Sequence, residues 1–280
     1  MALPLAGRIG PGTVSAALEV AGRLASDATE VITATAGRQA APDAKANPFD
    51  WVTETDRTLE RHTRRVLEAA FPGVPVLGEE YGGAEHGLPG EPGGPELLWI
   101  VDPVDGTANY VAGLRWCCYS LGLVDAQGPL VGVIADPYRG VVFSGARDRG
   151  LFADGRPMAP PAAPADGTLA GSLIFTEPGR PGTRPELAAL THGARAHHAG
   201  VRHLGSSALA LAQVPLGHAT AAVLPQSGYH SWDVAGALAL AVAAGLAVTD
   251  LDGRPSALPL DGVVVAVPAV LDEVLALING

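Results

Sequence analysis

Hydrophobic residues follow two spacings along this chain of 280 residues, and each spacing predicts a different element. In the first half, apolar positions three and four residues apart predict long helices over residues 14–35 and 53–70. Uninterrupted apolar runs after these helices predict five buried strands, and strands grouped after helices are typical of an α+β architecture. The predicted strands cover residues 74–77, 97–101, 117–124, 130–135 and 141–145.

The second half alternates strands with helices, as α/β folds do. Residues 157–166 are rich in proline and alanine and predict a linker between the halves. We therefore expect two subdomains, an α+β part over residues 1–156 and an α/β part over residues 157–280. Strands are predicted at 169–175, 219–224, 247–249 and 263–267, and helices at 185–192, 206–216, 232–244 and 269–278.

Two aspartates stand three residues apart at the end of the apolar run 97–101. Pro103 fixes its own φ and cannot donate a backbone hydrogen bond, so we expect the chain to leave the strand there and to turn Asp102 and Asp105 toward one point. The Val104 carbonyl offers a third oxygen. Mg²⁺ is usually held by a few such oxygens together with substrate phosphate. An acid-rich turn without a ligand is the alternative interpretation of these residues alone.

Glycine and threonine follow the second aspartate directly. Gly106 lets the backbone approach a ligand closely, and the amides from Gly106 to Ala108 face a phosphate if a short helix begins here. The stretch therefore indicates a joint metal and phosphate site.

Further acids lie at the ends of two other predicted elements. Glu79 and Glu80 follow the strand 74–77, and Asp233 lies in the first turn of the helix 232–244. Each has a structural explanation when it is taken alone, because strand ends are often solvated and because the helix dipole favours an acid in the first turn.

Taken together, these segments resemble the inositol monophosphatase family of metal-dependent, lithium-sensitive phosphatases. Residues 99–110 (WIVDPVDGTANY) match the family's WxxDPxDGTxNF motif, and residues 232–236 (WDVAG) match its second motif, of WDxA type. The resemblance extends from about residue 14 to the C-terminal end. Shorter matches are 50–56 (DWVTETD), 78–80 (GEE), 132–137 (GVIADP), 205–209 (GSSAL) and 249–253 (TDLDG).

The resemblance implies a layered αβαβα sandwich with the active site between its halves, and a homodimer. It also implies two or three Mg²⁺ ions in each active site. The first metal is assigned to Glu79, Asp102, Asp105 and the Val104 carbonyl. The second shares Asp102 and Asp105 and adds Asp233, while Glu79 borders a third, weaker position.

Roles in catalysis and substrate binding follow from the same resemblance. Thr107 and Glu79 are expected to orient and deprotonate the attacking water, while Asp56 hydrogen-bonds Thr107 or a metal-bound water. No covalent phosphoenzyme is required, because phosphoryl transfer needs mostly positioning and charge neutralisation. The phosphate group is assigned to Asp105, Gly106 and Thr107, and the rest of the substrate to Ser207, Gln226 and Asp233.

Gln226 departs from the inositol-specific family members, in which a glutamate precedes the Trp-Asp pair by seven residues. An amide exchanges hydrogen bonds with hydroxyl groups but carries no charge, so the preference for a cyclic polyol is expected to differ. Arg180 falls near a substrate loop of the family and offers a contact for a second anionic group, although a solvated loop arginine is the simpler interpretation.

We therefore predict a Mg²⁺-dependent phosphomonoesterase that acts on a small phosphorylated polyol, sugar or nucleoside by direct attack of metal-activated water. An inositol-1-phosphate-like compound is the leading substrate. Fructose-1,6-bisphosphate, 3′-phosphoadenosine-5′-phosphate and an intermediate of a biosynthetic pathway are the alternatives. A different class, a non-catalytic binding or regulatory protein that keeps the fold, is disfavoured by the full set of acids and threonine: Glu79, Asp102, Asp105, Thr107 and Asp233.

Composition narrows the choice of partners and location. A net charge of −11 argues against a nucleic-acid-binding surface. The sequence contains neither a signal-peptide pattern nor an apolar run long enough to cross a bilayer, so we expect a cytoplasmic protein. The adjacent Cys117 and Cys118 are predicted to be buried small hydrophobes. Lys45, the only lysine, is predicted to be an exposed loop residue, although family members often have a lysine near the site.

Overall fold

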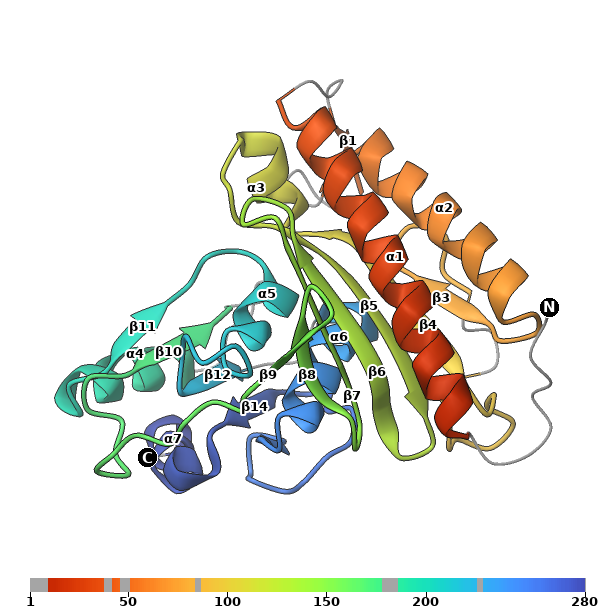
Figure 1. Cartoon of the computed structure of the whole chain (residues 1–280). Helices are drawn as coiled ribbons and strands as arrows, with labels where there is room; N and C mark the ends of the chain where they lie inside the picture. Colours follow the sequence, from red (N-terminus) through yellow and green to blue (C-terminus); the bar gives the residue numbers. More distant parts are fainter. Residues whose placement is uncertain are drawn as a thin grey trace.

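Helices and sheets alternate in five layers in the part of the chain that the structure describes (Figure 1). The structure is a computed structural model, and it describes residues 10–37, 42–45, 51–83, 87–177, 186–225 and 229–279. This arrangement confirms the αβαβα sandwich. In order, the layers are α1 (Pro11–Thr35) with α2 (Glu54–Ala70), a seven-stranded sheet, α5 (Ser207–Ala212) with α6 (Ser231–Ala243), a five-stranded sheet, and α4 (Glu186–Ala196) with α7 (Leu271–Asn279).

The seven-stranded sheet is covered by helices on both faces, which explains the long apolar runs of its central strands. Its strands follow one another in chain order, and each pair is antiparallel except the first. The strands are β3 (Val76–Gly78), β4 (Leu98–Asp105), β5 (Cys118–Asp125), β6 (Gly128–Asp136), β7 (Val141–Ala146), β8 (Gly150–Ala153) and β9 (Arg156–Met158).

The five-stranded sheet is mixed and has the order β11-β10-β12-β14-β13. Parallel pairing joins its first three strands, and antiparallel pairing joins the rest. Its strands are β10 (Leu173–Thr176), β11 (Gly200–Arg202), β12 (Ala221–Leu224), β13 (Ala247–Thr249) and β14 (Val263–Ala266). The remaining elements are the small pair β1 (Asp43–Ala44) and β2 (Trp51–Val52), the helix α3 (Thr107–Ala112) after β4, and the 3₁₀ turn η1 (Pro268–Val270).

Helix α6 belongs to the second half of the chain but lies directly on the sheet of the first half. A Cβ atom added to Gly132 of β6 would overlap the carbonyl of Gly236 in α6, and one added to Gly122 of β5 would lie 2.9 Å from the carbonyl carbon of Ala235. Glycine at these positions lets the helix and the sheet approach closely, and overpacking such a contact typically costs about 1–3 kcal/mol. The two halves therefore share one hydrophobic core, which includes Ile134 and Leu238.

The sequence predicted that the chain leaves the strand at Pro103, and this prediction is wrong. The strand continues to Asp105, and its pairing with β5 shifts between Asp102 and Asp105. A shift of this kind accommodates proline, because proline cannot donate a hydrogen bond to a neighbouring strand. Both aspartates therefore belong to the irregular end of a strand and not to a turn beyond it.

Other boundaries also differ from the prediction. The helix expected over residues 206–216 ends at Ala212, because Pro215 disfavours the helical conformation in the residue before it. The short strands β8, β9 and β11 were not predicted. Cys117 and Cys118 are buried free thiols, as predicted. Among the described helices, none is long and apolar enough to span a bilayer.

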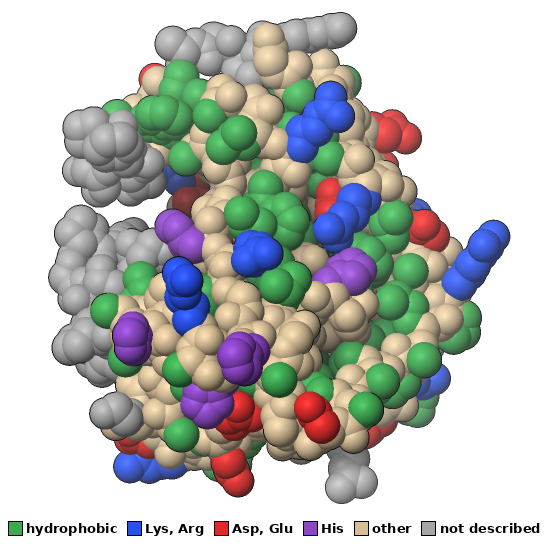
Figure 2. Space-filling model, turned by 90° about the vertical axis from the view of Figure 1, so that its left-hand side faces the viewer, with side chains coloured by type: hydrophobic (Ala, Val, Ile, Leu, Met, Phe, Trp, Pro, Cys, Tyr) green, Lys and Arg blue, Asp and Glu red, His purple; other side chains and the backbone are tan. Residues whose placement is uncertain are grey.

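The net negative charge is unevenly distributed over the surface. On the face seen in Figure 2, basic side chains (blue) and histidines (purple) are spread across the middle, between apolar patches. This face therefore differs from the uniformly acidic surface that the net charge of −11 suggests. Part of the acidic charge lies inside the molecule, in the cluster described next.

Candidate active site

The end of β4 presents Asp105 to the start of α5. The Oδ2 atom of Asp105 accepts hydrogen bonds from the Ser206 hydroxyl and from the Ala208 amide, at 2.9 Å from the amide nitrogen. The Ser207 amide nitrogen lies 3.3 Å from Oδ1. Asp102, by contrast, accepts a hydrogen bond from its own strand, at 3.0 Å from the Val104 amide nitrogen.

Glycine is required where the chain passes from β4 into α3. Gly106 has φ +88°, a left-handed conformation that L side chains rarely adopt. A Cβ atom there would lie 3.0 Å from the Gly205 carbonyl oxygen and 3.1 Å from the Trp116 carbonyl oxygen. The turn after β4 therefore packs closely against the turn before α5.

Asp233 joins the two aspartates of β4 from the first turn of α6. One carboxylate oxygen from each of Asp102, Asp105 and Asp233 lies within 4.8 Å of the others. Asp102 and Asp105 are buried, and Asp233 is half-buried. The backbone amide of His230 donates a hydrogen bond to Asp233, which fixes this carboxylate at the start of the helix. The sequence-predicted acids of the two halves thus meet at one point.

Burial and mutual repulsion raise the pKa values of this cluster. Burial raises the pKa of Asp102 well above its ordinary value, and the charges of Glu79, Asp105 and Asp233 raise it further. Burial raises the pKa of Asp105 to about 6, although its hydrogen bonds from Ser206 and Ala208 oppose this shift. Close carboxylates in a buried site are stabilised as anions by a cation, and an all-oxygen ligand set suits a hard divalent ion. The residues present therefore fit a divalent metal.

Lys45 is not the exposed loop residue that the sequence predicted. Its Nζ atom lies 2.8 Å from Glu79 Oε1 and 2.6 Å from Glu80 Oε1, and its side chain is 22% exposed. Burial alone lowers the pKa of Lys45, but the two glutamates raise it above its ordinary value overall. Burial raises the pKa of Glu80 to about 7, against the effect of the Lys45 hydrogen bond. Lys45 therefore neutralises part of the acidic charge beside the cluster.

A buried glutamate of α2 holds the turn that carries Glu79. Glu60 accepts hydrogen bonds from the amides of Glu80 and Tyr81, at nitrogen–oxygen distances of 2.7 and 3.2 Å. Arg64 lies 2.7 Å from Glu60 and also donates to the carbonyls of Val76 and Gly82. Sequence reasoning missed this pair. Its only local signal is a glutamate and an arginine four residues apart in a predicted helix.

Thr107 connects the start of α3 to the start of α2. Its Oγ1 atom lies 3.2 Å from Asp56 Oδ1 and 2.9 Å from the Val104 carbonyl oxygen. Asp56 in turn accepts hydrogen bonds from the amide and hydroxyl of Thr53, the N-cap residue of α2. Burial raises the pKa of Asp56 to about 6. The contact predicted between Asp56 and Thr107 is therefore present in the structure.

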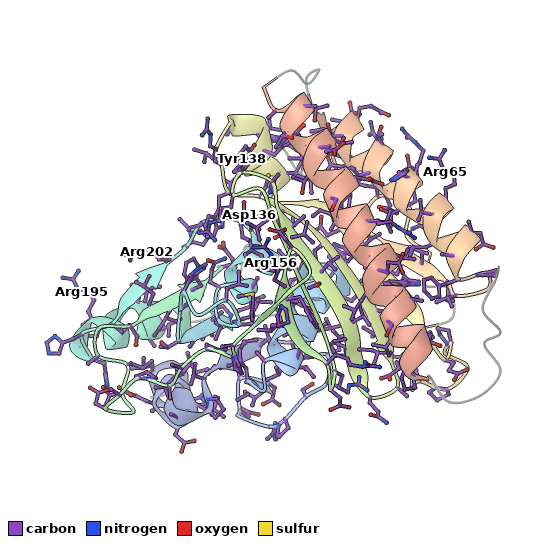
Figure 3. The ribbon with its side chains drawn as sticks, viewed as in Figure 1. Arg65, Asp136, Tyr138, Arg156, Arg195 and Arg202 are labelled. Carbon is purple, nitrogen blue, oxygen red and sulfur yellow. The ribbon has the colours of Figure 1, made fainter. Side chains whose placement is uncertain are left out.

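One further acid from the sequence motifs, Asp136, lies apart from the acidic cluster. Asp136, in the GVIADP segment, accepts hydrogen bonds from the amides of Tyr138 and Arg139 and closes the turn after β6 (Figure 3). It belongs to that turn and not to the three-aspartate cluster. Gln226 and Arg180 lie outside the described residues.

Comparison with known proteins identifies the family of the chain. The model of the inositol monophosphatase family matches residues 14–278. The chain belongs to this family. Inositol-1-monophosphatase ImpA from Mycolicibacterium smegmatis is 32% identical over 283 residues, which cover 99% of this chain and 97% of that protein. Proteins of the inositol monophosphatase family are phosphatases, so the chain is an enzyme, a metal-dependent phosphoric monoester hydrolase.

Solved structures of the inositol monophosphatase family share the fold. Inositol monophosphatase from Anabaena superposes with a TM-score of 0.78 at 27% identity, over 95% of this chain and 96% of that one. An IMPase/NADP phosphatase complexed with Mg²⁺ and phosphate superposes with a TM-score of 0.78 at 22% identity, over 96% of this chain and 97% of that one. The likeness to the second structure supports the fold alone.

Proposed function

We propose that this phosphatase uses Mg²⁺ to hydrolyse a small phosphorylated polyol, sugar or nucleoside by direct attack of water. The observation that carries the proposal is the convergence of Asp102, Asp105 and Asp233 within 4.8 Å. These acids, Glu79 and the Val104 carbonyl are the groups assigned to two or three Mg²⁺ ions. When bound, such ions lower the pKa of water and stabilise charge on the leaving oxygen.

The chain's own residues orient and deprotonate the attacking water. The Thr107 hydroxyl is held by Asp56 and by the Val104 carbonyl, so its lone pairs remain available to accept a hydrogen bond from water. We assign the acceptance of the proton to Glu79. The ammonium group of Lys45 lies 2.8 Å from Glu79 Oε1 and holds this carboxylate in position.

Substrate groups are assigned around the same acids. The phosphate is assigned to Asp105 and to the backbone of Gly106 and Thr107, and the remainder of the substrate to Ser207, Asp233 and Gln226. Among the possible substrates, an inositol-1-phosphate-like compound is favoured because the related ImpA is described as an inositol-1-monophosphatase. Fructose-1,6-bisphosphate, 3′-phosphoadenosine-5′-phosphate and a biosynthetic intermediate are the alternatives.

A homodimer is part of the proposal. Two leucines that contact Asn109 through their backbones are unusually exposed, Leu114 by 57% and Leu204 by 38%. Contiguous exposed apolar patches are typical of interaction surfaces, and we propose that these two leucines belong to one. A dimeric mass in light scattering, reduced to a monomeric mass by Leu114→Asp, is the expected result. An unchanged mass would exclude this surface.

The function is tested by measuring phosphate release with a panel of inositol, sugar, nucleotide and polyol phosphates. Each compound is assayed with Mg²⁺, without Mg²⁺, and with Mg²⁺ plus lithium. We expect Mg²⁺-dependent release from one compound class, inhibited by lithium and absent in the double variant Asp102→Asn, Asp105→Asn. Release that is independent of Mg²⁺, or that persists in the double variant, would contradict the proposed site.

A further inference from the structure

The turn that precedes α5 is held by a buried acid that the proposed chemistry does not use. Glu177 follows β10 and is 6% exposed. Its carboxylate accepts hydrogen bonds from two successive backbone amides, at 3.0 Å from the Leu204 nitrogen and 2.9 Å from the Gly205 nitrogen. His203 Nε2 lies 2.9 Å from the other side of the same carboxylate. The Glu177 side chain therefore fixes two successive backbone amides of this turn.

A second side chain, which belongs to the first half of the chain, binds the carbonyl oxygens of that turn. Asn109 of α3 donates from Nδ2 to the carbonyl oxygens of Leu204 at 2.6 Å, Trp116 at 2.8 Å and Gly205 at 3.2 Å. Gly205 has φ +81°, and a Cβ atom there would lie 3.1 Å from Asn109 Nδ2. The turn thus requires glycine both for its conformation and for this contact.

The residues immediately after the turn are the donors to Asp105. Ser206 and Ala208 bond Oδ2, and Ser207 lies near Oδ1. A displacement of the turn displaces all three donors together, because they are consecutive in the chain. Asp105 is buried, so its orientation depends on these hydrogen bonds and not on water.

We propose that Glu177 and Asn109 form a clamp on residues 204–205 that orients the Asp105 carboxylate for metal binding. The inference rests on the proposed function, because it takes Asp105 as a metal ligand. Glu177 and Asn109 act on Asp105 through residues 204–208, so both are positioning residues. Partners that orient the ligands of a metal typically change metal affinity by about 10–100-fold when they are removed.

Charge offers a competing explanation for one of the two residues only. The charge of Glu177 contributes to the electrostatic environment of Asp105, so Glu177→Gln changes both the electrostatic potential at the metal site and the position of the turn. Asn109→Ala removes no charge and tests the position of the turn alone. Since both residues act on one turn, the Kd of the double variant for Mg²⁺ is expected to be no higher than that of the more severe single variant.

The chain offers close controls for both substitutions. Glu273 also accepts a backbone amide, from Leu169 at 2.9 Å, and also pairs with a histidine, His197 at 2.6 Å. Asn279 also donates from Nδ2 to a carbonyl, that of Leu251 at 2.9 Å. Glu273→Gln and Asn279→Ala therefore remove interactions of the same kind, one backbone bond each, away from the clamp.

The test measures Mg²⁺ binding by calorimetry, together with kcat and KM at saturating Mg²⁺. We expect Glu177→Gln and Asn109→Ala each to raise the Kd for Mg²⁺ about tenfold. We expect kcat at saturating Mg²⁺ to stay within a few-fold of that of the unchanged enzyme, and the two control variants to leave the Kd unchanged. Glu177→Asp, which keeps the charge but shortens the side chain, replaces Glu177→Gln if that variant does not fold.

Three outcomes would overturn the clamp: an unchanged Kd in both single variants, an equal rise in Kd in the controls, or effects that multiply in the double variant. Asp105→Asn separates this failure from failure of the proposed function. If Asp105→Asn leaves Mg²⁺ binding unchanged, Asp105 is not a ligand and both ideas fail. If it abolishes binding while the clamp variants bind normally, only the clamp fails.

Discussion

The two regions that meet at the acidic cluster affect its two strand aspartates differently. On the side of the N-terminal sheet, Asp102 accepts a hydrogen bond from the Val104 amide and faces the charges of Glu79 and Asp56. On the side of α5, Asp105 receives donors from Ser206, Ser207 and Ala208. Both side chains are buried, so exposure does not explain the difference. The C-terminal region stabilises the Asp105 anion with three donors, whereas Asp102 accepts a hydrogen bond from the Val104 amide of its own strand.

The turn after β3 and the turn before α5 also differ, in the partner of the glutamate that holds each of them. Glu60 binds two successive amides of the turn after β3, and Arg64 offsets its charge. Glu177 binds two successive amides of the turn before α5 but is paired with His203, whose side chain is 53% exposed. An arginine partner stays charged at every physiological pH, whereas a histidine partner loses its charge near neutrality. The N-terminal turn is therefore the more firmly compensated of the two.

The largest expected effect is on turnover. The double variant Asp102→Asn, Asp105→Asn is expected to reduce Mg²⁺-dependent phosphate release to background, because it removes two of the three converging carboxylates. The melting temperature of the metal-free protein is expected to stay the same or to rise, because the substitutions also remove repulsion in the buried cluster.

The single variants sharpen the comparison between the two aspartates. Asp102→Asn is expected to stabilise the metal-free protein more than Asp105→Asn, since an asparagine amide at position 105 can no longer accept all three donors from α5. Thermal unfolding in the presence of a chelator measures both. Equal shifts in the two variants would show that the hydrogen bonds from α5 do not distinguish the aspartates.

The next largest effect is the pH dependence of stability without metal. The raised pKa values of Asp56 and Asp105 mean that the folded protein binds protons more tightly than the unfolded chain does. The stability that comes from protonating these two groups is therefore complete below pH 4 and is lost as the pH rises through about 6. A shift of Asp105 from 3.8 to about 6 corresponds to about 3 kcal/mol. We expect the melting temperature with a chelator to fall between pH 5 and pH 7, and Mg²⁺ to restore it mainly at pH 7. A metal-free melting temperature that rises over this range would contradict the repulsive cluster.

A smaller effect is expected from Ser206→Ala. The substitution removes a hydrogen bond to a buried carboxylate and the cap of α5, in which the Leu209 amide nitrogen lies 3.4 Å from Ser206 Oγ. Hydrogen bonds to charged groups contribute about 2 kcal/mol, so the melting temperature is expected to fall by about 4–8 °C. Ser207→Ala is the control for stability, because Ser207 approaches Asp105 through its backbone amide, which alanine retains. A similar fall in melting temperature in both variants would show that the Ser206 hydroxyl does not stabilise Asp105.

The sequence predicted the metal-ligand candidates better than the residues that hold them. Asp102, Asp105 and Asp233 each belong to a recognisable motif, and the structure brings them together. Glu60 and Glu177 have no such signal, because each acts on backbone amides about 20 to 28 positions away in the chain. Backbone contacts of this kind depend on tertiary structure and leave no local pattern. The roles assigned to the site residues stay predictions.

The same distinction applies to the fold. The long helix predicted over residues 14–35 agrees with α1, since its buried positions repeat from Val14 to Ile32, over about five turns. Strands β8, β9 and β11 were missed, whereas the equally short β13 was predicted at residues 247–249. β8 and β11 begin with glycine and β9 contains proline, residues that are depleted in strands. The division at residue 156 also stays a prediction. The packing of α6 on the first sheet shows how closely the two halves are joined.

The smallest expected effect concerns the cation on the N-terminal side of the comparison. Lys45 pairs with Glu79 and Glu80 in a partly exposed position, so Lys45→Met is expected to cost at most about 1 kcal/mol of stability. Because the ammonium group and Mg²⁺ compete for the Glu79 carboxylate, the Mg²⁺ concentration for half-maximal thermal stabilisation is expected to fall. Arg57→Met, which removes the exposed pair with Asp43, is the control and is expected to leave this concentration unchanged. A higher Mg²⁺ requirement in Lys45→Met would mean that Lys45 supports the metal-binding arrangement of Glu79 instead of competing with the metal.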